Sequence, residues 1–89
     1  MKRRHVSDPR YHLGPMDDLY DLVLGMVERR FDGETRERFA GWLCSVTPTQ
    51  AHMNVMLTEM ALSGQAMGNR ELVLTGFTAD GQPLINLLQ

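Results

Sequence analysis

Cysteine is nearly absent from this chain of 89 residues, which contains only Cys44. A single cysteine excludes a disulfide within the chain and suits a reducing compartment. A nucleophilic cysteine would need a neighbouring base, and two of the three histidines, His5 and His12, lie close to the N-terminus. We therefore expect Cys44 to be a buried structural thiol.

Long hydrophobic runs are also missing. The longest, such as residues 22–24, fall far short of the roughly 20 apolar residues that span a bilayer. The N-terminus is basic, but no apolar segment follows it, so the sequence predicts no signal peptide. We expect a soluble, cytoplasmic protein with no membrane partner.

Residue patterns that carry catalysis or bind cofactors are absent as well. The sequence has no glycine-rich phosphate loop and no Cys-x-x-Cys pair, and His52 has no second metal-ligating residue four positions later. Asp17, Asp18 and Asp21 could hold a cation, but the helix dipole explains acidic residues at a helix start. The expectation is a protein without enzymatic activity, metal or cofactor.

Positive charge is scarce outside the N-terminus. Residues 1–15 hold four Lys or Arg against one Asp, whereas residues 16–89 hold five against ten acidic residues. Residues 1–15 also lack regular apolar spacing, which predicts a flexible arm before a single domain over residues 16–89. The cations of the arm could contact nucleic-acid phosphates, or they could simply form a solubilising tail. They are Lys2, Arg3, Arg4 and Arg10.

Helical spacing of apolar residues dominates the first two thirds of the chain. It predicts one helix that begins at about Asp17 and ends at Gly33, and a second over residues 34–46. A third predicted helix covers residues 47–68, with Thr47 as its N-terminal cap.

The third predicted helix is apolar around more than half of its girth. Between residues 40 and 69 the only charged residue is Glu59, which is typical of a helix surrounded by other protein. Its most regular stripe is expected to be core, or an adaptable surface for a partner protein. This stripe comprises Met53, Met56, Leu57, Met60, Gly64 and Met67.

After residue 69 the apolar spacing changes from helical to alternating. Residues 71–78 and 82–88 are predicted strands that flank a short loop at residues 79–81. We expect Leu72 and Leu74 on one face and Phe77 on the other. A hairpin that is apolar on both faces is marginal alone, and the chain is small for a single core, so we expect a homodimer. Its predicted interface comprises Leu72, Leu74, Phe77, Leu84, Ile85 and Leu87.

The predicted fold class is α+β, with three helices followed by a C-terminal β-hairpin. Such a fold fits a small non-enzymatic regulator or adaptor that acts as a homodimer and binds an unidentified protein partner. It also fits a winged-helix DNA-binding regulator, in which the third helix would address base edges. We favour the first hypothesis because the third predicted helix has no Lys or Arg. The predicted partner-binding residues are Gln50, His52, Met53, Asn54, Met56 and Met60.

Overall fold

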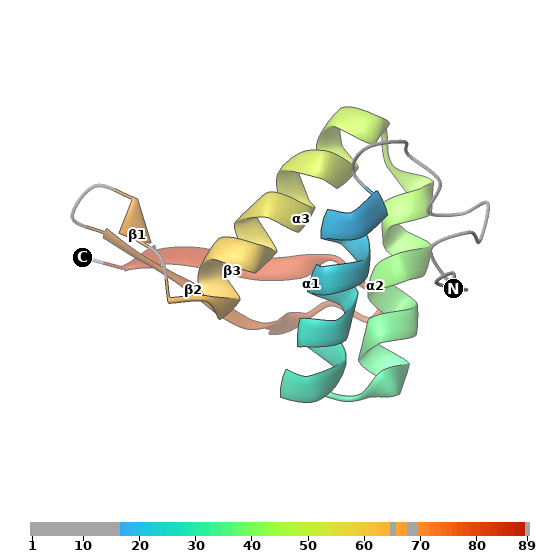
Figure 1. The fold of residues 1–89 in the computed structure, drawn as a ribbon, viewed down its shortest axis with the longest axis horizontal. Coiled ribbons are helices and arrows are strands. Elements are labelled where there is room, and N and C mark those ends of the chain that lie inside the picture. The colour runs from blue at the N-terminus through green and yellow to red at the C-terminus, as the bar shows by residue number, and fades with distance from the viewer. Residues whose placement is uncertain (1–16, 65, 68–69, 89) are drawn as a thin grey trace.

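The computed structural model describes residues 17–64, 66–67 and 70–88, and it contains three helices followed by an antiparallel sheet (Figure 1). This confirms the predicted α+β fold. The predicted arm, residues 1–15, lies outside the described residues. The elements are α1 (Asp17–Arg30), α2 (Gly33–Ser45), α3 (Pro48–Leu62), β1 (Ala66–Met67), β2 (Arg70–Phe77) and β3 (Pro83–Leu88).

Side-chain caps fix the starts of α2 and α3. The Thr35 N–H donates to the Asp32 carboxylate at 2.7 Å, and the Gln50 N–H donates to the Thr47 hydroxyl at 3.1 Å. The predicted cap at Thr47 is therefore confirmed. The hydrogen bonds with Thr35 hold the pKa of Asp32 below its ordinary value. Because that pKa is lowered by folding, the cap stabilises the protein above the unfolded pKa and loses its effect as pH falls through the folded pKa.

Helix α3 ends six residues earlier than the predicted boundary at Gly68, so that prediction is wrong. The Ser63 N–H donates to the Glu59 carbonyl at 2.9 Å, and Gly64 then adopts a φ of 76°. Glycine adopts this left-handed conformation without the steric cost of a Cβ, which makes it a common helix terminator. The chain continues into β1, a two-residue strand that the sequence pattern does not predict and that pairs with β2.

A β-bulge changes which face of the sheet Phe77 occupies. Strand β2 pairs with β3 in antiparallel register, and the register shifts between Leu74 and Gly76. On β3, the partners of Leu72, Leu74 and Phe77 are residues 87, 85 and 83, which share one face. Phe77 therefore lies on the same face as Leu72 and Leu74, and the prediction that it faces the opposite way is wrong.

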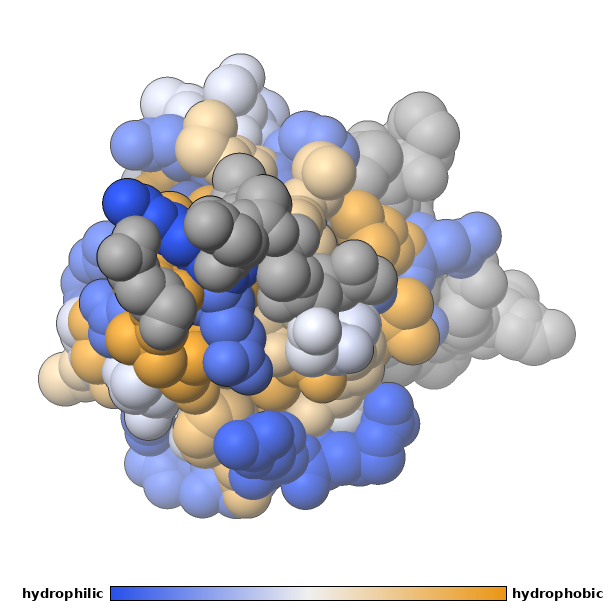
Figure 2. All heavy atoms as spheres, turned by 90° about the vertical axis from the view of Figure 1, so that its left-hand side faces the viewer, coloured by the Kyte–Doolittle hydropathy of each residue, from blue (hydrophilic) through white to orange (hydrophobic). Residues whose placement is uncertain are grey.

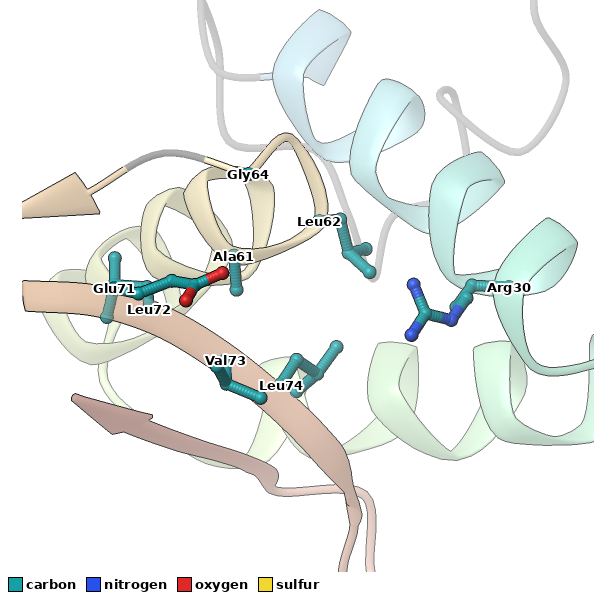
Figure 3. Close-up of a pocket in the computed structure, with 8 residues that line it drawn as sticks. All are labelled: Arg30, Ala61, Leu62, Gly64, Glu71, Leu72, Val73 and Leu74. Atoms are coloured by element: carbon teal, nitrogen blue, oxygen red, sulfur yellow. The ribbon is translucent and has the colours of Figure 1, made fainter. Parts of the chain in front are cut away.

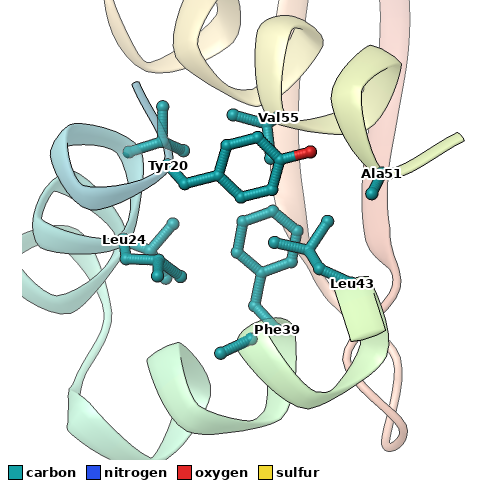
Figure 4. Close-up of a cluster of buried hydrophobic side chains, with 9 residues drawn as sticks. Tyr20, Leu24, Phe39, Leu43, Ala51 and Val55 are labelled. Atoms are coloured by element: carbon teal, nitrogen blue, oxygen red, sulfur yellow. The ribbon is translucent and has the colours of Figure 1, made fainter. Parts of the chain in front are cut away.

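The core lies between the three helices, and the sheet is attached to it through Phe77. Side chains of all three helices, including Tyr20, Phe39 and Val55, are almost completely buried (Figure 4). The Phe77 ring lies edge-on to Phe31 at a centroid distance of 5.4 Å and tilted against Phe39 at 5.1 Å. Burial also raises the pKa of the Tyr20 phenol. Each fully buried large side chain contributes about 1.5–3 kcal/mol, so this cluster holds the helices together.

Helix α3 turns a different face to the core from the one its most regular stripe predicts. Its buried residues are Ala51, Val55 and Thr58, whereas Met53 and Met56 are exposed. The prediction of a buried methionine stripe is therefore wrong for these two residues. The alternative expectation, an adaptable surface open to a partner, is compatible with their exposure.

Gly81 generates a prediction about stability, because the loop between β2 and β3 comes very close to α2. Gly81 has a φ of 101°, and a Cβ there would lie 2.0 Å from the Arg38 carbonyl oxygen. We expect Gly81→Ala to lower the free energy of unfolding by at least about 2 kcal/mol, measured by urea denaturation. Gly41→Ala is the control, since a Cβ at this exposed helical position meets nothing within 4 Å. It should raise the free energy of unfolding by about 1 kcal/mol. Equal denaturation midpoints for the two variants would contradict this account.

Candidate interaction surfaces

Large hydrophobic side chains are exposed at six positions within the described residues. Their exposed fractions lie between 43% and 53%. Five of the six belong to two segments without any charged residue, the first three turns of α3 and the whole of β3. The six residues are Leu22, Met53, Met56, Leu84, Leu87 and Leu88. Charge-free, exposed apolar surface is the composition found at the centre of protein interfaces.

The first candidate surface belongs to β3, and we define the β3 surface as residues 84–88. Strand β3 is at one edge of the sheet, whose strand order is β1-β2-β3. The end of the hairpin that carries Leu88 extends beyond α3 (Figure 1). Seen from this end, the molecule shows patches of hydrophobic side chains between hydrophilic ones (Figure 2). The β3 surface thus combines exposed leucines with a strand edge.

The structure divides the six predicted dimer-interface residues into two sets. Leu72 and Leu74 are buried, and Phe77 packs against the helices, so these side chains are already used within one chain. The other three, Leu84, Ile85 and Leu87, belong to the β3 surface, where both leucines are exposed and Ile85 is half-buried.

Leu88 is an exposed residue that the predicted interface omits. It lies four positions after Leu84 on the same strand, so the two side chains share a face. The alternation of residues along the predicted strand could therefore have added Leu88 to the predicted interface.

The second candidate surface is on α3, and we define the α3 surface as Gln50, Met53 and Met56. All three side chains are exposed, and they follow one another at intervals of three residues along one side of the helix. The other predicted partner-binding residues are less accessible, since His52, Asn54 and Met60 are half-buried. The Asn54 side-chain amide also donates to the Gln50 carbonyl oxygen at 2.9 Å.

The His52 Nδ1 atom is buried and lacks a hydrogen-bond partner among the described residues. Of the six predicted partner-binding residues, three thus have exposed side chains, namely Gln50, Met53 and Met56.

The electrostatic character of the described region is acidic. Residues 17–88 contain five arginines and ten Asp or Glu. Two of these arginines are in ion pairs on or near α2, with Arg36 3.7 Å from Glu28 and Arg38 3.5 Å from Glu34. The α3 surface and the β3 surface contain no cation. Neither surface is therefore suited to phosphate binding through its own side chains.

A shallow pocket of about 290 Å³ lies between α1, α3 and β2 (Figure 3). The Arg30 guanidinium is at one end of it and the Glu71 carboxylate at the other, with Leu62 and Leu74 between them. A second pocket of about 340 Å³ shares Arg30 and Leu62. The described lining of both pockets contains no nucleophile and base placed together, so it offers no catalytic arrangement.

Within residues 17–64, 66–67 and 70–88, no three His, Cys, Asp or Glu side chains are grouped so that they could hold a metal ion. No helix in this part of the chain has both the length and the apolar character needed to cross a membrane.

No family model, no curated protein and no solved structure matches the chain.

Cys44 is exposed, so the prediction of a buried thiol is wrong. The buried residues of α2 are Thr35, Phe39, Ala40 and Leu43, which leaves Cys44 one position beyond the core-facing stripe. A step of one residue rotates a side chain by about 100° around a helix, since 3.6 residues make one turn. The sulfur therefore lies on the solvent side of α2.

This exposure predicts that Cys44 reacts with a thiol reagent in the folded protein. We expect the rate with 5,5′-dithiobis(2-nitrobenzoate) to be similar with and without denaturant, since unfolding is not needed for access. Cys44→Ala should be unreactive and should change the free energy of unfolding by less than about 0.5 kcal/mol. Strong protection of the thiol in the native protein would contradict the exposed position.

Proposed function

We propose that the protein is a small, non-enzymatic regulator or adaptor that acts through protein–protein contacts as a homodimer. The observation that carries the proposal is the concentration of exposed apolar side chains on two charge-free segments of an otherwise acidic domain. Exposed apolar clusters on a small domain mark interaction sites more often than scattered single residues do.

The two surfaces suit different kinds of contact. The β3 surface offers backbone N–H and C=O groups at a strand edge together with leucine side chains, which suits pairing with another strand. The α3 surface offers two flexible methionine side chains and one carboxamide, which suit an adaptable contact with another protein. We therefore assign self-association to the β3 surface and partner binding to the α3 surface.

The charge of the domain indicates which partner the α3 surface favours. With twice as many acidic as basic residues in residues 17–88, the domain attracts a positively charged protein during encounter. The preferred partner has an apolar centre that covers Met53 and Met56, and a basic rim. This combination gives complementary charge around an apolar contact, as stable interfaces require.

The self-association proposal predicts different results for two leucines of the hairpin. Leu84→Glu places a charge on the exposed β3 surface, so we expect a folded monomer by light scattering and circular dichroism. Leu74→Glu should unfold the domain, because its side chain is buried and the new charge would be unpaired. Leu22→Glu, at an exposed position on α1, is the control and should remain dimeric. A wild-type protein that is monomeric at micromolar concentration would refute self-association.

A DNA-binding regulator is the alternative, and one observation favours it. Three helices precede a hairpin, and Thr49 and Gln50 are exposed at the start of α3, where a recognition helix would contact bases. The charge distribution opposes this alternative, because α3 has no cation and the loop of the hairpin contains Asp80. Specific protein–DNA interfaces are strongly positive.

A gel-shift experiment separates the two functions. We expect no shift of sheared genomic duplex DNA at about 150 mM salt, where charges are screened over about 8 Å. If the four cations of residues 1–15 bound phosphates, the slope of log affinity against log salt would reach about −4 per chain. Recovery of one enriched DNA sequence that Gln50→Ala no longer binds would replace the adaptor by the DNA-binding regulator.

A further inference from the structure

The hydrogen bonds of β3 show which of its backbone N–H and C=O groups point to its open edge. The Thr75 hydroxyl donates to the Leu84 carbonyl at 3.2 Å, and the Thr78 N–H donates to the Gln82 carbonyl at 2.9 Å. The carbonyls of residues 82 and 84 therefore point to β2. Because these directions alternate along a strand, Ile85 and Leu87 direct their N–H and C=O groups away from β2, to the open edge.

This edge lacks the features that usually prevent strands from pairing. No described strand lies beyond β3, and none of its six residues is charged. Natural edge strands are commonly guarded by lysine, by proline or by a bulge. Here the bulge is on β2, and the single proline within β3, Pro83, is its first residue. The edge from Leu84 to Leu88 is thus available for pairing.

We propose that two copies of the chain join their β3 edges in antiparallel register around a two-fold axis at Asn86. This inference rests on the proposed homodimer and specifies how it forms. The axis is perpendicular to the sheet, so the two three-stranded sheets become one continuous sheet with the helices of both copies on the same side. Asn86 then faces the partner's Asn86, Ile85 faces the partner's Leu87, and Leu84 faces the partner's Leu88.

The side chains of β3 select this register among the possible ones. An axis at Ile85 would place Leu84 opposite Asn86, and an axis at Leu87 would place Asn86 opposite Leu88. The axis at Asn86 alone sets each leucine opposite an aliphatic residue and sets the amide opposite an amide. Aliphatic pairs facing each other across strands stabilise a sheet, whereas an amide opposite leucine gains no hydrogen bond.

The backbone supports the same register. Ile85 and the partner's Leu87 would form a hydrogen-bonded pair, because both residues direct their N–H and C=O groups to the edge. The two-fold axis repeats this pair between Leu87 and the partner's Ile85. Each pair exchanges both N–H···O bonds, so four main-chain hydrogen bonds join the two copies.

Charge indicates that the occupant of this edge is a second copy. Residues 17–88 carry twice as many acidic as basic residues, so two copies repel each other wherever their charged surfaces meet. Strand β3 is uncharged along its whole length, and pairing it with itself places no like charges opposite each other. An uncharged strand edge thus lets two acidic copies meet at low electrostatic cost, and unlike the uncharged turns of α3 it also offers main-chain hydrogen bonds.

Disulfide cross-linking in a full-length Cys44→Ser background tests the register. Residues facing each other in a non-hydrogen-bonded antiparallel pair have Cα atoms about 4.5 Å apart, within the roughly 4.4–6.8 Å that a disulfide bridges. Mild oxidation of Asn86→Cys should therefore shift the band on a non-reducing gel from monomer to dimer. Leu84→Cys should remain monomeric when oxidised alone, since its copies would lie about 13 Å apart along the strands.

Mixing two different cysteine variants gives a second, independent test of the register. Leu84→Cys mixed with Leu88→Cys should form a disulfide heterodimer, although neither forms one alone. Thr49→Cys, on the exposed start of α3, is the control for random collision and should give no dimer.

The outcomes distinguish the register from the homodimer itself. A protein that light scattering shows to be dimeric, but in which Leu84→Cys cross-links and Asn86→Cys does not, would overturn the register and leave the homodimer standing. A monomeric wild-type protein would overturn both. Amide protection of Ile85 and Leu87 that appears only when a different protein is added would assign the edge to that protein and overturn self-pairing.

Discussion

The ring of Phe77 is the contact on which the arrangement of hairpin and helices depends. It meets Phe31 edge-on and lies tilted against Phe39, so one side chain links β2 to the α1–α2 connection and to α2. Aromatic pairs of this kind contribute about 0.5–1.5 kcal/mol each beyond the burial of their area. The bulge between Leu74 and Gly76 turns this ring towards the helices, and the close approach of Gly81 to Arg38 lets the loop follow it. Without the bulge, strand alternation would place Phe77 on the face opposite Leu72 and Leu74.

The parts of the fold that depend on local signals could be predicted from the sequence. The cap at Thr47 and the alternation after residue 69 are properties of short segments, and both lead to the observed elements. The face of Phe77 could not be predicted, because it depends on where β2 gains a residue relative to β3. The core-facing side of α3 was equally ambiguous, since its apolar residues surround the helix and the small Ala51 and Val55 pack closest to the core. The burial of Cys44 was ambiguous for the same reason, since Cys44 is exposed although the adjacent Leu43 is buried.

The candidate surfaces consist of the apolar side chains that are not buried within the chain. Once Leu72, Leu74 and Phe77 are used within the chain, the exposed apolar residues of the hairpin are those on β3. Once Val55 and its neighbours face the core, Met53 and Met56 remain outside. In a dimer joined through β3, the helices of both copies lie on one side of the sheet, so both α3 surfaces are presented to the same side. A partner with two matching sites would then bind with an effective concentration set by their separation rather than by its own concentration.

The shortness of β1 limits how far such an assembly can grow. A sheet joined at one edge can in general recruit further copies at the other edge, which leads to open-ended fibres. Here the other side of β2 is paired by only two residues, Ala66 and Met67, and it begins at the exposed charges of Arg70 and Glu71. Charge and the shortness of β1 make this edge a poorer template for another strand than β3. In the proposed dimer, growth beyond two copies is therefore disfavoured, so an uncharged, leucine-rich edge need not lead to a polymer.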